Sequence, residues 1–222
     1  AVSIIAETAA PAGVLNIAEG QTGLIIAANA ADHIFLKGLT VDGGGIGFTG
    51  IEARSAQAVS LKDCVFRNFF RTPGFGFVTR ATTPISVSLE DVSVSDITTV
   101  GVSLVGSEAA PITASLYRVK IEGARLGFTA SGAGKVSVSA SRFAGNETAI
   151  LIGAGMQASL SVSQLLGNTK GLDNAGIAAL SNMTVAGHGN GVNSQSGATT
   201  HTFMNNVFAQ NNVDVAGPAL LP

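Results

Sequence analysis

The sequence predicts an all-β fold: a single-stranded, right-handed parallel β-helix, which is a solenoid of about eight coils with three short strands in each coil. Two apolar residues five positions apart return every 20 to 28 residues along nearly the whole chain. Apolar residues also alternate strictly with serine in the segments before many of these pairs. A fixed internal period of this size is typical of solenoids. We therefore expect one β-helix domain over residues 1–222, with residues 215–222 as a C-terminal cap or tail.

Each predicted coil begins at a glycine followed by an apolar residue, as in Gly50-Ile51 and Gly101-Val102. A first strand, a connection and a second strand follow. The second strand ends at the first residue of the apolar pair, and a third strand holds the other residue. The pairs are Leu36 and Val41, Leu61 and Phe66, Leu89 and Val94, Leu116 and Ile121, Val138 and Phe143, Leu160 and Leu165, Leu180 and Val185, and Phe203 and Phe208.

The second strands carry the clearest pattern, for example from Ile85 to Leu89, where apolar residues and serines alternate. A period of two indicates half-buried strands with the apolar side inward and serine outward. Parallel stacking then places like residues in columns. Several coils also carry asparagine after the third strand, and we expect its amides to form an internal structural ladder. These asparagines are Asn68, Asn146, Asn168 and Asn211.

Composition excludes several classes of function. Charged residues make up 12% of the chain, about half the usual share, and the net charge of −2 argues against a nucleic-acid partner. No run of about 18 apolar residues occurs, so we expect no membrane span. The single cysteine, Cys64, falls at an inward position of the repeat, so neither a disulfide nor a cysteine metal site is expected. No cofactor is predicted.

The start of the chain carries no signal-peptide pattern and no capping helix before Val2, so we expect either removal of an upstream segment or pairing with another subunit.

Two segments, Asp63-Cys-Val-Phe-Arg-Asn-Phe69 and Asn205-Asn-Val-Phe-Ala-Gln-Asn-Asn212, give the most specific family signal. With His33-Ile-Phe-Leu-Lys-Gly-Leu-Thr-Val-Asp-Gly43, they make the chain resemble right-handed parallel β-helix repeat proteins. More narrowly, it resembles a group of secreted bacterial proteins without an assigned activity. The resemblance covers essentially the whole chain and implies an extracellular or cell-surface location.

The wider β-helix superfamily includes pectate lyases and polygalacturonases, but a shared fold does not carry an activity over. The polygalacturonase-like motif Gly-His-Gly is present as Gly187-His188-Gly189, without the companion Asn-Thr-Asp and Asp-Asp motifs. The resemblance therefore assigns no catalytic residue, and whether the chain is an enzyme stays open.

Unequal spacing predicts two neighbouring loops. Most coils place 6 or 7 residues between the third-strand anchor and the next glycine, but 9 separate Val41 from Gly50 and 10 separate Phe66 from Gly76. A further loop is expected at 103–113, on the opposite connection, with Glu108. Loops on a rigid scaffold carry function more often than the coils do.

One ionic cluster falls beside these loops. Counting from the glycine anchors places Glu52, Arg54 and Arg80 on one outer face. Arginine binds carboxylates with two parallel hydrogen bonds, and phenylalanine offers an apolar platform. A solvated basic edge is the other interpretation, and no second acidic residue stacks beside Glu52 as glycoside hydrolysis would require. The candidate substrate-binding residues are Glu52, Arg54, Arg67, Arg71, Phe75 and Arg80; no metal ligands are predicted.

Smooth serine columns favour a structural role. One outward column of the predicted coils consists of Ser60, Ser88, Ser115, Ser137 and Ser159. Such a face has few charged groups to desolvate, so little opposes its contact with a partner. The leading hypothesis is a secreted or surface-exposed structural or adhesive protein, self-assembling and non-catalytic. Its expected partners are further copies of itself, in a homo-oligomer or a head-to-tail array. The alternative is a module that binds or cleaves acidic polysaccharides, as a lyase or hydrolase would.

Overall fold

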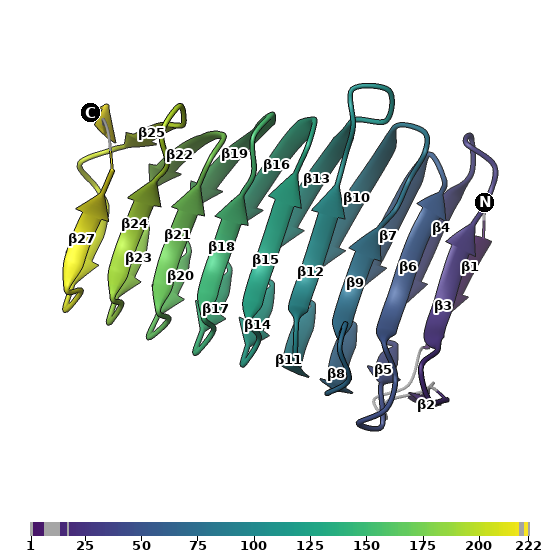
Figure 1. Cartoon of the computed structure of the whole chain (residues 1–222). Helices are drawn as coiled ribbons and strands as arrows, with labels where there is room; N and C mark the ends of the chain where they lie inside the picture. Colours follow the sequence, from purple (N-terminus) through teal and green to yellow (C-terminus); the bar gives the residue numbers. More distant parts are fainter. Residues whose placement is uncertain (1, 7–13, 17, 218–219, 222) are drawn as a thin grey trace.

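The computed structural model shows a parallel β-solenoid of about eight coils, described at every residue except 1, 7–13, 17, 218–219 and 222. Each coil contributes one strand to each of three parallel sheets, which we call A, B and C (Figure 1). The described part of the chain contains no helix. This confirms the predicted fold class, and the arrangement is consistent with the right-handed β-helix fold.

The chain passes from sheet C to sheet A to sheet B in each coil. Sheet A comprises β1 (Val2–Ile5), β4 (His33–Lys37), β7 (Ala58–Lys62), β10 (Ile85–Glu90), β13 (Ile112–Tyr117), β16 (Gly134–Ser139), β19 (Met156–Ser161), β22 (Ile177–Ser181), β25 (Thr199–Thr202) and β28 (Leu220–Leu221). Sheet B comprises β2 (Val14–Asn16), β5 (Thr40–Asp42), β8 (Val65–Phe69), β11 (Ser93–Ile97), β14 (Lys120–Glu122), β17 (Arg142–Ala144), β20 (Gln164–Leu166), β23 (Thr184–Ala186) and β26 (Val207–Ala209). Sheet C comprises β3 (Thr22–Ala27), β6 (Thr49–Ser55), β9 (Phe75–Thr79), β12 (Val100–Val105), β15 (Leu126–Ser131), β18 (Thr148–Ile152), β21 (Lys170–Asn174), β24 (Asn190–Ser194) and β27 (Val213–Ala216).

The apolar pairs form two columns of the core. Leu61 on β7 lies in register with Leu36 and Leu89 on the neighbouring strands of sheet A. Phe66 on β8 lies in register with Val41 and contributes one of the largest fully buried side chains. Because these anchors stack on their equivalents one coil away, the hydrophobic core is continuous along the axis, as the repeat predicts. The prediction is wrong for Phe203, which is 51% exposed, because Thr202 instead lies in register with Leu180.

The glycine anchors allow neighbouring coils to approach closely. A Cβ added at Gly101 would lie 2.6 Å from the carbonyl oxygen of Gly127 in the next coil. This distance is too short for any side chain, so the glycine at the start of each coil is required by the close stacking of the backbone.

A ladder of polar side chains lies inside the corner between sheets B and C. The Asn168 Oδ1 atom accepts the Asn146 backbone N–H at 2.8 Å, and its Nδ2 atom donates to Phe143 O at 3.2 Å. The expected ladder is confirmed for Asn146, Asn168 and Asn211. The expectation for Asn68 is wrong, because its Nδ2 atom donates to Asp42 in the neighbouring loop instead.

Cys64 is fully buried, as its repeat position predicts, and its Sγ atom lies 3.2 Å from Lys62 O. Burial raises the pKa of this thiol. At the C-terminal end, β28 pairs with β25 in sheet A, while Pro218 and Pro222 of the expected cap lie outside the described residues. Within the described part, no helix is long and apolar enough to cross a membrane.

Candidate functional site

The predicted ionic cluster forms on the outer face of sheet C. Arg54 donates from Nε to Glu52 Oε1 at 2.7 Å, and Arg80 Nε lies 3.9 Å from the same oxygen. The Glu52 side chain is only 8% exposed, whereas those of Arg54 and Arg80 are 51% and 58% exposed. The three residues therefore combine one shielded carboxylate with two guanidinium groups that reach the solvent.

The register explains why these residues meet. Glu52 on β6 lies beside Val78 on β9, and Val78 lies beside Ser103 on β12. The Arg80 backbone N–H donates to Ala53 O at 2.8 Å, which sets Arg80 next to Arg54 in the adjacent coil. The outward column predicted by counting from the glycine anchors, from Glu52 through Val78 to Ser103, is therefore confirmed.

A shallow hollow of about 470 Å³ lies next to Arg80. Its lining residues are Phe75, Val78, Thr79, Arg80, Ala81, Ser103, Val105, Gly106 and Ser107. Phe75 and Arg80 were both predicted as site residues, whereas those from β12 and the turn after it were not. Their contribution depends on how the 106–111 loop leaves sheet C, which the period of the repeat does not encode.

The structure places Arg67 and Arg71 in ion pairs of their own. Arg67 donates from Nε to Asp42 Oδ2 at 2.8 Å, and Arg71 pairs with Glu19. Neither arginine lines the hollow beside Arg80. Of the six predicted site residues, Glu52, Arg54 and Arg80 are joined by ion pairs, and Phe75 lines the same hollow as Arg80. Arg67 and Arg71 are not part of this group.

Asp42 organises the first of the two predicted loops. Its Oδ1 atom accepts the Gly44 backbone N–H at 2.9 Å and lies 3.0 Å from Asn68 Nδ2. Burial by itself raises the pKa of Asp42, but these bonds and the contact with Arg67 outweigh it and hold the pKa below the usual value. The tip of the loops exposes two apolar side chains, Ile46 and Phe70.

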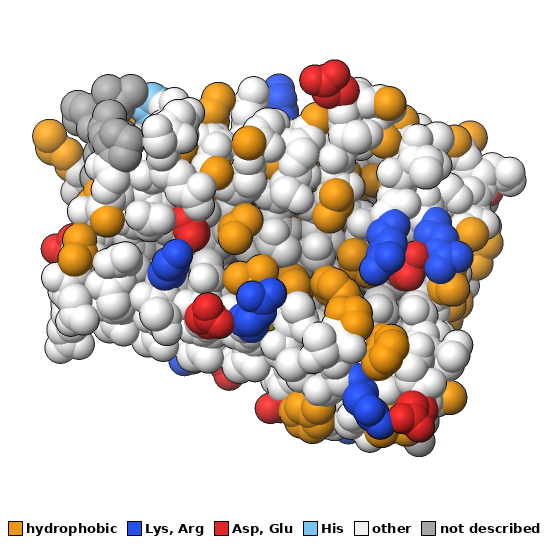
Figure 2. Space-filling model, viewed as in Figure 1, with side chains coloured by type: hydrophobic (Ala, Val, Ile, Leu, Met, Phe, Trp, Pro, Cys, Tyr) orange, Lys and Arg blue, Asp and Glu red, His pale blue; other side chains and the backbone are white. Residues whose placement is uncertain are grey.

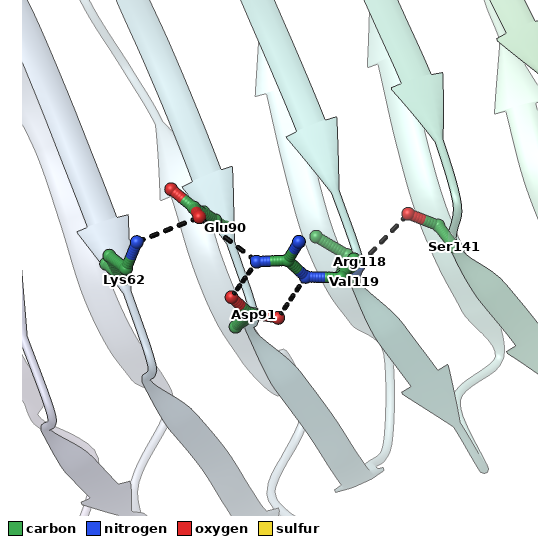
Figure 3. A network of polar contacts seen from close by, with 6 residues as sticks. All are labelled: Lys62, Glu90, Asp91, Arg118, Val119 and Ser141. Atoms are coloured by element: carbon green, nitrogen blue, oxygen red, sulfur yellow. Dashed lines mark hydrogen bonds and ion pairs between the residues drawn. The ribbon is translucent and has the colours of Figure 1, made fainter.

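A second polar network braces the corner between sheets A and B (Figure 3). Lys62 Nζ lies 2.8 Å from Glu90 Oε1, and Arg118 bonds both Glu90 and Asp91. The Arg118 guanidinium also lies 4.2 Å from the centre of the Tyr117 ring. Its hydrogen bond to Asp91 lowers the pKa of that carboxyl group. Sequence reasoning missed Arg118, although it follows Asp91 by one coil.

Asp173 forms a third polar cluster, further along sheet C. This carboxylate accepts hydrogen bonds from Gln195 at 2.8 Å, Asn193 at 2.9 Å and Lys170 at 3.0 Å. Burial raises the pKa of Asp173, but the three hydrogen bonds outweigh burial and lower it overall. Figure 2 shows the face of sheet C with such charges in small mixed groups, separated by neutral surface.

The outer face of sheet A is different, because it is nearly free of charge from β7 to β22. Ser60, Ser88, Ser115, Ser137 and Ser159 lie in register along it. Two shallow hollows of about 410 Å³ each overlap on this face and share Thr113, Ala114 and Ser137. Lys135 is the one charged residue that lines them. The small side chains thus leave a shallow trough whose lining is uncharged except for Lys135.

His188 of the Gly-His-Gly motif is 3% exposed, and its ring is hydrogen-bonded within the internal ladder. Among the residues that the structure describes, no group of three or more His, Cys, Asp or Glu side chains could hold a metal ion.

Comparison of the chain with known proteins finds no matching family model, no matching curated protein and no matching solved structure.

Proposed function

We propose that the protein is a secreted or surface-exposed structural solenoid that self-associates through the outer face of sheet A, without catalysis. The observation that supports this most is the shallow trough along β7 to β22, with its serine column and one charged lining residue, Lys135. The predicted extracellular or cell-surface location belongs to the same proposal.

The chemistry of the trough favours contact with another protein surface. Serine and alanine lose little side-chain freedom when they are buried, unlike lysine or glutamate. Charged groups would have to be desolvated at a cost of several kcal/mol each, and here Lys62, Glu90 and Arg118 already pair with one another at the edge of the sheet. Within the trough, Lys135 is the charged residue that contact along sheet A would have to desolvate.

Sedimentation velocity of charge variants tests the proposal. We expect the wild-type chain to associate at high concentration, and Ser115→Glu with Ser137→Glu to remain monomeric, because two buried carboxylates would oppose contact. Gln164→Glu with Thr169→Glu adds the same charge at exposed positions away from sheet A and is expected to associate as wild type. A wild-type chain that stays monomeric at high concentration contradicts the proposal.

A second candidate function is binding of an acidic polysaccharide at the hollow beside Arg80. The observation that favours it is that Phe75 and Arg80 line the same hollow, with Arg54 in contact with Glu52 next to Arg80. A guanidinium group and an apolar wall suit a carboxylate-bearing sugar. Binding fits this geometry better than cleavage, because the Glu52 carboxylate is shielded and bonded to Arg54.

Calorimetric titration with a polyuronate tests this candidate. The Arg54→Ala and Arg80→Ala double variant should lose binding. Arg125→Ala with Arg142→Ala removes the same charge from exposed positions outside the hollow and should retain it. Equal losses in the two double variants would show that binding depends on net charge alone.

A further inference from the structure

Lys135 lies on β16, one of the two central strands of the trough between β7 and β22. Its side chain is exposed and lines a hollow of about 410 Å³. In register, Thr113 on β13 lies on one side of it and Gln157 on β19 on the other. Ser137, two residues further along β16, faces the same side of the sheet and lines the same hollow. Hydroxyl and amide groups therefore surround one ammonium group.

The chain supplies no counter-ion to Lys135. Among the described residues, no carboxylate forms an ion pair with its ammonium group. Glu90, at the edge of sheet A, pairs with Lys62 and Arg118. Glu108, in the loop that leads into β13, makes no ion pair with Lys135. The hollow thus carries a positive charge that the fold does not neutralise.

The polar groups around Lys135 are free to bind a ligand. In the part of the chain that the structure describes, the side chains of Thr113, Ser137 and Gln157 form no hydrogen bond with another residue. Ammonium, hydroxyl and amide groups can all donate. Hydrogen bonds to an ionised acceptor are roughly twice as strong as those between neutral groups. The hollow therefore has both the donors and the charge that a small oxyanion requires.

Contact between two copies would make this charge costly. Covering the trough removes Lys135 from water, and desolvation of an ion costs several kcal/mol unless an opposite charge accompanies it. A symmetric pair brings one such lysine from each copy. No acidic residue lines either hollow of the trough. A bound anion would supply the missing negative charge.

We propose that the hollow around Lys135 binds a small oxyanion such as phosphate, and that this anion promotes self-association through sheet A. The inference rests on the proposed self-association. The anion accepts hydrogen bonds from Lys135 Nζ and from the hydroxyl groups of Thr113 and Ser137. Because it binds more tightly where it neutralises a covered lysine, mass action favours the associated state. Association raises the affinity for the anion by the same factor.

Sedimentation velocity in low-millimolar inorganic phosphate, or in sodium chloride of equal ionic strength, tests this. We expect phosphate to tighten the association of the wild-type chain by at least about 10-fold. Lys135→Thr introduces the residue that the preceding coil carries in the same column. This variant should associate more tightly than wild type in chloride, because no ammonium group is covered, and phosphate should not tighten it further.

Lys120→Thr is the matched control, since it removes the same charge from an exposed position on β14 of sheet B. It should keep the wild-type response to phosphate, and general salting-out would act on both variants alike. An equal response in Lys135→Thr, or none in a wild-type chain that associates, would overturn the anion site alone. If wild type and Lys135→Thr both stay monomeric in either salt, self-association itself is contradicted, and the inference falls with it.

Discussion

The ladder predicts a large loss of stability when Asn168 is replaced by leucine. The side chain is 3% exposed and satisfies two buried backbone groups, the Asn146 N–H at 2.8 Å and Phe143 O at 3.2 Å. Each buried group left without a partner costs about 1–3 kcal/mol. Asn168→Leu should therefore lower the free energy of unfolding by about 2–6 kcal/mol.

Urea denaturation at neutral pH, followed by circular dichroism, measures this loss. Thr169→Leu is the matched control. Thr169 is the next residue in the chain and its side chain is exposed, so this variant introduces the same leucine without removing a ladder contact. We expect the control to unfold within about 0.5 kcal/mol of wild type. If Asn168→Leu also stays within that range, the ladder does not hold the coils together as we argue.

Three further predictions concern the scaffold. Val162 is a β-branched residue with a left-handed backbone φ of 49°, and Asn182 has φ of 52° at the equivalent position of the next coil. Because asparagine tolerates this backbone conformation better than valine, Val162→Asn should raise the free energy of unfolding by about 1 kcal/mol in a urea titration. The lowered pKa of Asp173 stabilises the fold at neutral pH, and this contribution is lost as the pH falls through the folded-state value. Urea midpoints between pH 6 and pH 3 should therefore fall more steeply for wild type than for Asp173→Asn, and parallel curves would refute this. Phe66→Ala should cost about 3–5 kcal/mol in the same urea assay, because Phe66 is fully buried in the core.

Much of the fold could be predicted because its main constraints are local and periodic. Leu61 and Phe66 lie in register with their equivalents, and the outward column through Glu52 follows the count from the glycine anchors. Period-two alternation fixes which side chains face inward, and parallel stacking repeats that choice in every coil.

The remaining features depend on the reach of individual side chains. Asn68 leaves the ladder because the adjacent loop brings Asp42 to it. Arg118 crosses to Asp91 of the preceding coil, and His188 imitates an asparagine through the placement of its two ring nitrogens. None of these contacts changes the period, so spacing alone does not reveal them.

Distances between spin labels test the central claim, that sheet A is the surface through which copies of the chain meet. A label is attached at Ser137→Cys on β16, or at Gln164→Cys on β20 of sheet B as the control; the native Cys64 is fully buried and should not react. We expect dipolar broadening at high concentration for the Ser137→Cys label alone, which disappears on dilution with unlabelled protein. Absence of broadening at Ser137→Cys, or equal broadening at both positions, would contradict the account.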